Sequence, residues 1–210
     1  MQNGKYSLYI ELKQKILTME PDQTLSLDEF SLSGQYHISR TPIREVLRLL
    51  AGEGYIEIEE RRGARVKPLN SSTISELISV APMIYSAIGR LAVRNALPAQ
   101  IQDLKQAQQR FQKALSTRDA HGLIAEEHRF HSIIGQMSSN NYLKLSYERL
   151  LIDDIRMSYN LYFLETSEMD DRRNLAAEHH DIFIEAIEMH DEDSIVKLIP
   201  THFELSRQTW

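Results

Sequence analysis

The stretch SRTPIREVLRLL, residues 39–50, decides the fold of the first part of this chain. It predicts an amphipathic helix, because Ser39 or Thr41 can cap the first free amides and Pro42 suits a first helical turn. Apolar residues then recur with the i, i+3, i+4, i+7 spacing of a buried face. They are Ile43, Val46, Leu47 and Leu50. We expect this face to pack against the rest of a small domain.

Three arginines, Arg40, Arg44 and Arg48, recur every fourth residue outside this apolar face. A guanidinium can bond a guanine edge through two N–H groups in the major groove, which is wide enough to admit a helix, or it can neutralise phosphate. An arginine stripe on an isolated helix is often only a solvated face. The segments that flank residues 39–50 favour a DNA recognition helix over a solvated face.

A second helix and a hairpin flank the stretch in the order of a winged helix-turn-helix. Residues 25–36 have a short helical pattern, and only two residues separate them from Ser39. Residues 55–59 alternate as in a strand, and residues 60–63 turn into a second strand over 64–68, with Gly63 able to take positive φ. The basic side chains that could reach phosphates or the minor groove from this wing are Arg61, Arg62 and Arg65. This order predicts DNA binding by residues 1–70.

The composition agrees with an intracellular protein of two parts. The 210 residues are 42% hydrophobic and include no apolar run typical of a signal sequence or membrane span, so we expect a cytoplasmic protein without membrane association. The absence of cysteine excludes disulfides and thiolate metal ligands. Residues 1–70 hold 10 basic and 10 acidic side chains, so the excess negative charge lies beyond them. A neutral DNA-binding domain is mildly unusual, although contacts depend on local clustering.

Residues 71–210 show no convincing strand pattern and predict an antiparallel helical bundle. The helices are expected near residues 73–96, 98–117, 120–137, 141–165, 170–189 and 191–208. Pro82 should kink the first of them and Pro200 the last. The predicted fold class is therefore mostly α, a winged helix-turn-helix over residues 1–70 followed by an all-α bundle over residues 71–210.

Seven of the eight histidines lie in the predicted bundle. Glu127 and His131 are four residues apart on one helix and project from the same face. His180 and His202 fall on the last two helices. Three imidazoles and one carboxylate suit zinc, nickel, manganese or iron. The spacing by itself leaves open that these are ordinary core or surface histidines.

The motif of residues 39–47, with the Leu-x-x-Glu-Gly turn of residues 50–54, resembles the GntR family of bacterial transcription regulators. The rest of the chain resembles the FCD effector domain of the FadR branch of that family. The resemblance implies that recognition-helix arginines contact operator DNA, with Thr41 beside them and Gly63 at the wing tip. Phe30 is a departure, since the family usually has an arginine there. The predicted DNA-binding residues are Arg40, Thr41, Arg44, Arg48, Arg62 and Gly63.

The resemblance also implies a metal site. FCD domains that bind metal use an aspartate and a histidine one turn apart, a histidine two helices later, and a last histidine near the C terminus. The corresponding residues are Glu127, His131, His180 and His202, with glutamate in place of aspartate. They imply a bound divalent cation, zinc or nickel. Four other histidines are not expected to bind metal: His179, which matches a glutamate in the family pattern, His128 and His190 at the surface, and His121 in a loop or cap.

The chain departs from the family at the effector pocket. The first FCD helix often carries an arginine and, one turn later, a glutamate that line the pocket, and these positions are Ala81 and Tyr85 here. Tyr85 is a candidate pocket residue or a core residue, and Arg90 and Arg156 are candidate clamps for a carboxylate. Pro200 lies just before His202 and could displace that ligand.

The sequence therefore predicts a metabolite-responsive transcription regulator rather than an enzyme. We expect a homodimeric repressor that binds double-stranded operator DNA and a small effector such as an organic acid, since two recognition helices meet half-sites on one duplex. One alternative is a metal-dependent hydrolase or oxygenase with Glu178 or Asp181 as general base. Another is a structural metal, or none, in a bundle that serves only for dimerisation.

Overall fold

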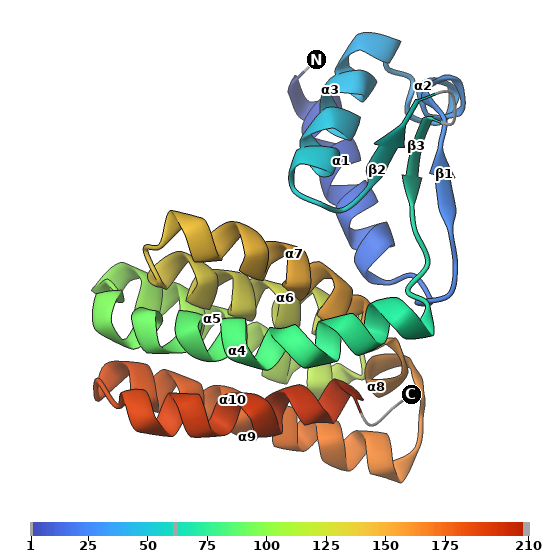
Figure 1. Cartoon of the computed structure of the whole chain (residues 1–210). Helices are drawn as coiled ribbons and strands as arrows, with labels where there is room; N and C mark the ends of the chain where they lie inside the picture. The colour runs from blue at the N-terminus through green and yellow to red at the C-terminus, as the bar shows by residue number, and fades with distance from the viewer. Residues whose placement is uncertain (1, 61–62, 208–210) are drawn as a thin grey trace.

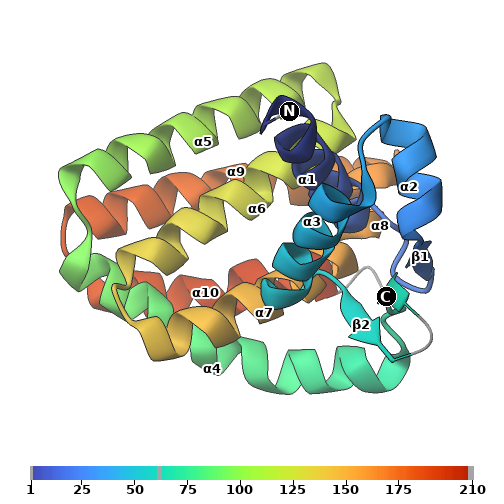
Figure 2. The same ribbon diagram turned by 90° about the horizontal axis from the view of Figure 1, so that it is seen from above.

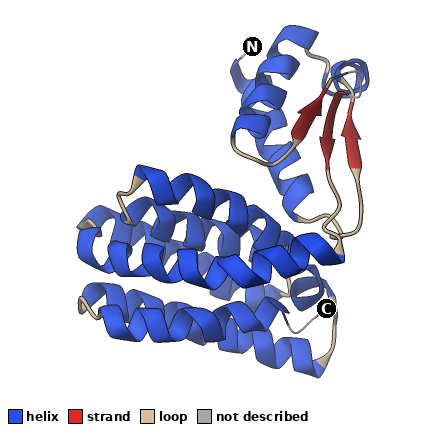
Figure 3. Cartoon of the chain, in the orientation of Figure 1, coloured by secondary structure: helices blue, strands red, loops and turns tan. Residues whose placement is uncertain are grey.

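The computed structural model describes residues 2–60 and 63–207, which form a small winged domain above a helical bundle (Figure 1). The winged domain contains α1 (Gln2–Leu17), β1 (Leu25–Leu27), α2 (Glu29–Tyr36), α3 (Arg40–Gly52), β2 (Glu57–Glu59) and β3 (Gly63–Val66). Its strands form an antiparallel sheet in the order β1-β3-β2, with β3 in the centre. The sheet lies at one side of the domain, beside the helices (Figure 3).

The helix α3 forms as its sequence pattern predicts. The four residues of the apolar face, Ile43, Val46, Leu47 and Leu50, are all buried. Ser39 occupies the N-cap position with extended backbone, but its side chain makes no capping hydrogen bond. The helix ends because Gly54 takes a φ of 89° and the N–H of Tyr55 turns back to the carbonyl of Leu50 at 2.9 Å.

The segment before α2 corrects one prediction. Residues 25–27, expected to be helical, form β1, in which Leu27 pairs with Ala64 of β3 and is buried. The helix starts only after Asp28, whose carboxylate accepts a hydrogen bond from the N–H of Ser31 at 2.8 Å. The backbone N–H and C=O groups of β1 form hydrogen bonds with a strand far away in the sequence. The local sequence pattern does not indicate that such a partner exists. The helix α1 was also not predicted.

The second domain is a bundle of helices (Figure 2). They are α4 (Ser71–Asn95), α5 (Pro98–Thr117), α6 (Ala120–Met137), α7 (Asn141–Met157), α8 (Tyr159–Phe163), α9 (Ser167–Glu188) and α10 (Glu192–Arg207). The expected helix over 141–165 is broken at Ser158 into α7 and α8. Ser158 leaves the helical region with a ψ of 5°, and its hydroxyl donates to the carbonyl of Asp154 at 3.0 Å.

The helix α4 contacts α6, α7 and α10 and forms part of the bundle core. Contrary to the expectation from sequence, it is long and apolar enough to cross a membrane by length and composition. Its buried residues, which include Leu77, Ala81 and Ile88, belong to the hydrophobic core of the protein. The helix α10 continues through Pro200, and His202 lies one turn before its end.

The two domains are joined by polar contacts between the winged domain and helices α6 and α7. The buried guanidinium of Arg156 donates to the carbonyl of Lys67 at 3.0 Å and to that of Pro21 at 3.4 Å. The hydroxyl of Tyr55, in the winged domain, hydrogen bonds with Nε2 of His128 on α6 at 2.9 Å. These contacts hold the winged domain against one end of the bundle.

Candidate metal centre and nucleic-acid interface

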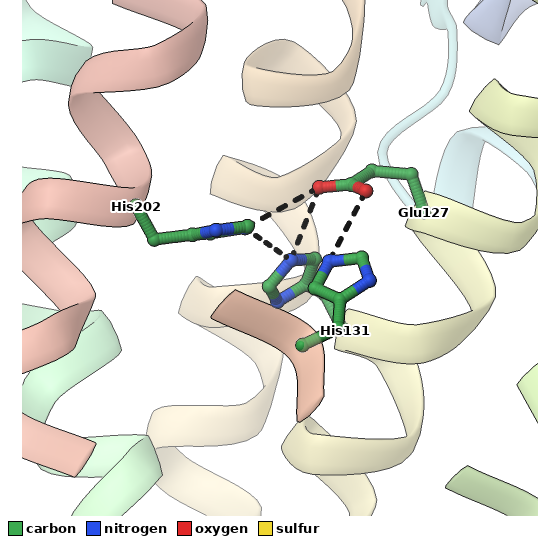
Figure 4. A group of neighbouring side chains, drawn as sticks. Glu127, His131 and His202 are labelled. Atoms are coloured by element: carbon green, nitrogen blue, oxygen red, sulfur yellow. Dashed lines mark hydrogen bonds and ion pairs between the residues drawn. The ribbon is translucent and has the colours of Figure 1, made fainter. Parts of the chain in front are cut away.

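The bundle brings together the four residues predicted to bind metal. Glu127 and His131 come from α6, His180 from α9 and His202 from α10, and one ligand atom of each lies within 4.8 Å of all the others. Nε2 of His131 is 3.2 Å from Oε1 of Glu127 and 3.0 Å from Nε2 of His202. Nε2 of His180 is 3.3 Å from Oε2 of Glu127. Figure 4 shows three of these side chains pointing toward one another.

These distances fit a divalent cation. Ligand atoms about 2.1 Å from a zinc ion lie about 3.0–3.4 Å from one another in octahedral or tetrahedral geometry. Oε2 of Glu127 and Nε2 of His180 are also buried without a hydrogen-bond partner of normal geometry, although they face each other. Buried polar atoms left unsatisfied are costly, and a shared cation would satisfy both. The donor set of imidazoles and one carboxylate is the kind that binds zinc or nickel.

The protonation states expected for these residues are those of metal ligands. Burial opposes the charge on Glu127, but the three surrounding imidazoles hold the pKa of its carboxyl well below the usual range. Burial lowers the pKa of His180, and it lowers the pKa of His202 to about 4. At neutral pH the carboxylate is therefore ionised and these two imidazoles are neutral, the forms that bind a cation.

Gln108 on α5 orients one ligand and was not predicted. Its side-chain oxygen lies 3.0 Å from Nδ1 of His180, while its amide nitrogen donates to the carbonyl of Ala177 and the carboxylate of Asp181. This assignment makes Nδ1 of His180 the N–H donor and leaves the Nε2 lone pair for the cluster. Gln108 lies on a different helix and has no characteristic sequence spacing from the predicted ligands, so nothing in the sequence pointed to this role.

The other histidines have different surroundings. His179 is buried next to His202, with ring centroids 5.5 Å apart, but it lies outside the cluster of ligand atoms. His128 was expected at the surface and instead lies at the domain junction, where burial lowers its pKa to about 3. His190 is exposed after α9, and His121 is exposed in the first turn of α6.

A small cavity of about 40 Å³, here called the bundle chamber, adjoins the cluster. Its polar lining residues are Tyr85, Glu127, His131, Tyr147, Asp154, Ser158, Tyr162, His202 and Ser206, and its apolar ones include Phe183, Ile199 and Phe203. No lysine or arginine among the described residues lines it. Asp154 was not predicted as a pocket residue, and burial raises the pKa of its carboxyl to about 7.

Of the three predicted effector contacts, only Tyr85 lines the bundle chamber. Arg90 lies on the outer face of α4 and pairs with Glu192 at 3.4 Å. Arg156 points to the domain junction and pairs with backbone carbonyls there. An effector held in the bundle chamber would contact neither arginine, because both side chains are engaged elsewhere. Arg90 and Arg156 lie on the helices where the sequence placed them, but the sequence did not show that their side chains point away from the chamber.

The described members of the predicted DNA-binding set are exposed, and most of them line one groove of the winged domain. Arg40, Thr41, Arg44 and Arg48 are exposed on α3, and all but Thr41 line a groove that also includes Gly63. Gly63 has the positive φ expected for the wing, 76°. Arg62 and its neighbour Arg61 lie outside the described residues.

Two of the three arginines of α3 contact side chains of α2. Nε of Arg44 donates to both carboxylate oxygens of Glu29 on α2 at 2.8 Å. The guanidinium of Arg40 lies 5.5 Å from the centre of the Phe30 ring, which is 70% exposed. Phe30, where an arginine was expected by resemblance, thus supports an arginine of the neighbouring helix.

A winged helix-turn-helix that presents arginines, joined to a helical domain with a small internal cavity, is the architecture of a transcription regulator that binds DNA. Residues 6–66 match the family described as "Bacterial regulatory proteins, gntR family", and residues 76–205 match the FCD domain. The chain belongs to the GntR family and carries a C-terminal FCD domain.

Known relatives agree with this assignment. The gluconate operon transcriptional repressor of Bacillus licheniformis is 25% identical over 92% of this chain and 79% of its own length. The repressor RspR of Escherichia coli is 22% identical over 85% of this chain and 76% of its own length. The solved structure of E. coli McbR/YncC has the same fold, with a TM-score of 0.76, 18% identity and 98% of each chain covered. The domains and relatives indicate a transcription regulator and not an enzyme.

If the cluster binds a metal ion as predicted, replacing His180 and His202 together by alanine is expected to abolish that binding, because two of the four donor residues are lost. Metal content after dialysis, measured by inductively coupled plasma mass spectrometry, tests this. His179→Ala is the matched control and should keep its metal, since its ring is buried beside the cluster without belonging to it. Stoichiometric metal in the double variant would show that the ligands are misassigned.

Proposed function

We propose that this protein is a metabolite-responsive repressor whose bundle, residues 71–210, holds a divalent cation, zinc or nickel, while residues 1–70 bind the operator in the cytoplasm. The observation that carries the proposal is the buried set of Glu127 and three histidines beside the bundle chamber. When bound, the cation would supply a Lewis-acidic centre with room for an oxygen ligand in a shell of more than four. The names of the relatives support the role of repressor.

Operator recognition is assigned to Arg40, Thr41, Arg44 and Arg48 of α3, with Gly63 and Arg62 of the wing. The exposure of the α3 residues and their position along one groove support this assignment. On binding DNA, Arg44 would exchange the carboxylate of Glu29 for a phosphate or a guanine edge.

Arg44→Ala is expected to weaken binding to the operator roughly 5- to 100-fold, because a guanidinium that contacts a base or phosphate is lost. The operator can be obtained by selection from random duplexes with the wild-type protein, and affinity measured by fluorescence anisotropy. Arg94→Ala, an exposed arginine of the bundle, is the control and should leave affinity unchanged. Equal affinity of the wild type and Arg44→Ala would refute the assignment.

The effector is proposed to be a small organic acid. A carboxylate oxygen is a suitable additional ligand for the cation, and Tyr85 lines the same chamber. The name of the gluconate operon repressor supports a sugar acid. A cavity of about 40 Å³ holds only one or two waters, so α4, α9 or α10 must move to admit such a molecule.

Movement of α6 would couple the effector to the winged domain. Glu127 belongs to the cluster, while the next residue, His128, forms a hydrogen bond of 2.9 Å with Tyr55 of the winged domain. A shift or rotation of this helix therefore changes both contacts together. For coupling, the effector must favour one arrangement of the two domains over the other.

Tyr55→Phe is expected to reduce this coupling, because it removes the hydroxyl that bonds His128 and keeps the ring. The measurement is the ratio of operator affinities with and without the organic acid that stabilises the protein most; typical coupling factors are about 5- to 150-fold. Tyr9→Phe, which removes a hydroxyl bonded within the winged domain, is the control. An undiminished ratio in Tyr55→Phe would exclude this contact as the coupling route.

We further propose that the protein is a homodimer formed through α4 and α7, which pack side by side. Both helices carry exposed apolar side chains, and a stable dimer typically buries about 800 Å² per partner. These side chains are Val80, Met83, Tyr142 and Leu145.

Met83→Asp is expected to give a monomer, because a carboxylate would be buried in this interface. Sedimentation velocity measures the oligomeric state. Met189→Asp is a matched control, since Met189 is similarly exposed, 74% against 65%, but lies at the end of α9. A wild-type monomer, or a dimer that survives Met83→Asp, would contradict the proposed interface.

A further inference from the structure

The bundle chamber is lined by two polar groups of different chemistry. One is the metal-binding set around Glu127, and the other is Asp154 of α7 with the hydroxyls next to it. Asp154 is partly buried in the bundle and lines the chamber. An effector that coordinates the cation through one end must place its other end in this chamber, so Asp154 is positioned to contact it.

Asp154 can accept hydrogen bonds from a ligand. The hydroxyl of Ser206 on α10 lies 3.2 Å from Oδ1 of Asp154 and 3.0 Å from the carbonyl of Phe203, and its single proton can go to either acceptor. The hydroxyl of Tyr85 on α4 faces the same carboxyl without a hydrogen bond of normal geometry. An ionised carboxylate offers about four acceptor positions, so these neighbours leave acceptor capacity unused. A hydroxyl group of a ligand would fill it.

The charges that face the chamber oppose a second carboxylate. Glu127 and Asp154 are the two acidic lining residues, and no cationic side chain among those described offsets them. A bound divalent cation balances these two charges, and one ligand carboxylate can be accepted as its additional ligand. A second ligand carboxylate would meet Asp154 in a buried site, where repulsion between like charges is weakly screened.

We propose that Asp154 determines effector specificity by accepting a hydrogen bond from a hydroxyl at the far end of a monocarboxylic acid and by excluding dicarboxylic acids. This inference rests on the proposed function, since it requires an acid in the bundle chamber. The ligand class is therefore a hydroxylated monocarboxylate.

Pairs of acids that differ only at the far end test the proposal. Gluconate and glucarate share a six-carbon skeleton and end in a hydroxymethyl or a carboxylate, and glycerate and tartronate form the equivalent three-carbon pair. Affinities are measured by isothermal titration calorimetry on the full-length, zinc-loaded protein at pH 8, where Asp154 is ionised because its pKa is about 7. In the pair that fits the chamber, the hydroxymethyl acid should bind at least tenfold more tightly.

Asp154→Asn removes the charge and keeps the shape, so it should reduce that preference at least tenfold, mainly through tighter binding of the dicarboxylate. Asp153→Asn is the matched control on the adjacent residue. Asp153 lies near Arg149 and Arg156, 3.4 and 3.9 Å away, and does not line the chamber, so the preference should not change. Metal content and circular dichroism confirm that each variant is folded and loaded.

Equal affinities within both pairs for the wild type would overturn the proposal and leave the proposed function standing. An unchanged preference in Asp154→Asn would do the same. Failure of all four acids to bind the zinc-loaded protein would overturn both. If Asp154→Asn does not fold, the wild-type affinities for the two acids of each pair still test the proposal, because equal affinities would refute the role of Asp154.

Discussion

The burial of an ionised carboxylate among three imidazoles is the constraint on which the rest of the structure depends. Glu127 lies inside the bundle, where an unpaired charge would be strongly destabilising. Its compensation comes from helices far apart in sequence, so α6, α9 and α10 must meet at this level of the bundle. The small chamber lies beside the cluster, and Asp154 of α7 also lines it.

Features with a local signature could be predicted from the sequence. The apolar face of α3 follows from helical spacing, and Glu127 and His131 share a face because they are four residues apart. The prediction that His180 and His202 join them came from a family resemblance, because the number of residues between two positions does not give their distance in space. The orientation of Arg90 and Arg156 was not predictable, because it depends on partners, Glu192 and the carbonyl of Lys67, supplied by distant segments.

Other differences have the same origin. The strand β1 exists because β3 pairs with it, and α7 ends where Ser158 leaves the helical conformation and α8 begins. His128 resembles any surface histidine in the sequence, yet it meets Tyr55 across the domain junction. Because His128 follows Glu127 directly, α6 presents adjacent residues to the candidate metal site and to the winged domain, which is the basis of the coupling proposed above.

The ion pair between Arg44 and Glu29 has a consequence for how the protein searches a genome. Residues 1–70 are electrically balanced, and this arginine of the reading helix already has an acidic neighbour, so the domain exerts little long-range attraction on a polyanion. In the proposed complex, a phosphate of nonspecific DNA would have to displace Glu29 from Arg44 without a matching base to compensate. On this proposal, nonspecific DNA is bound more weakly than the number of arginines alone suggests, and ionic strength has a smaller effect on the first encounter.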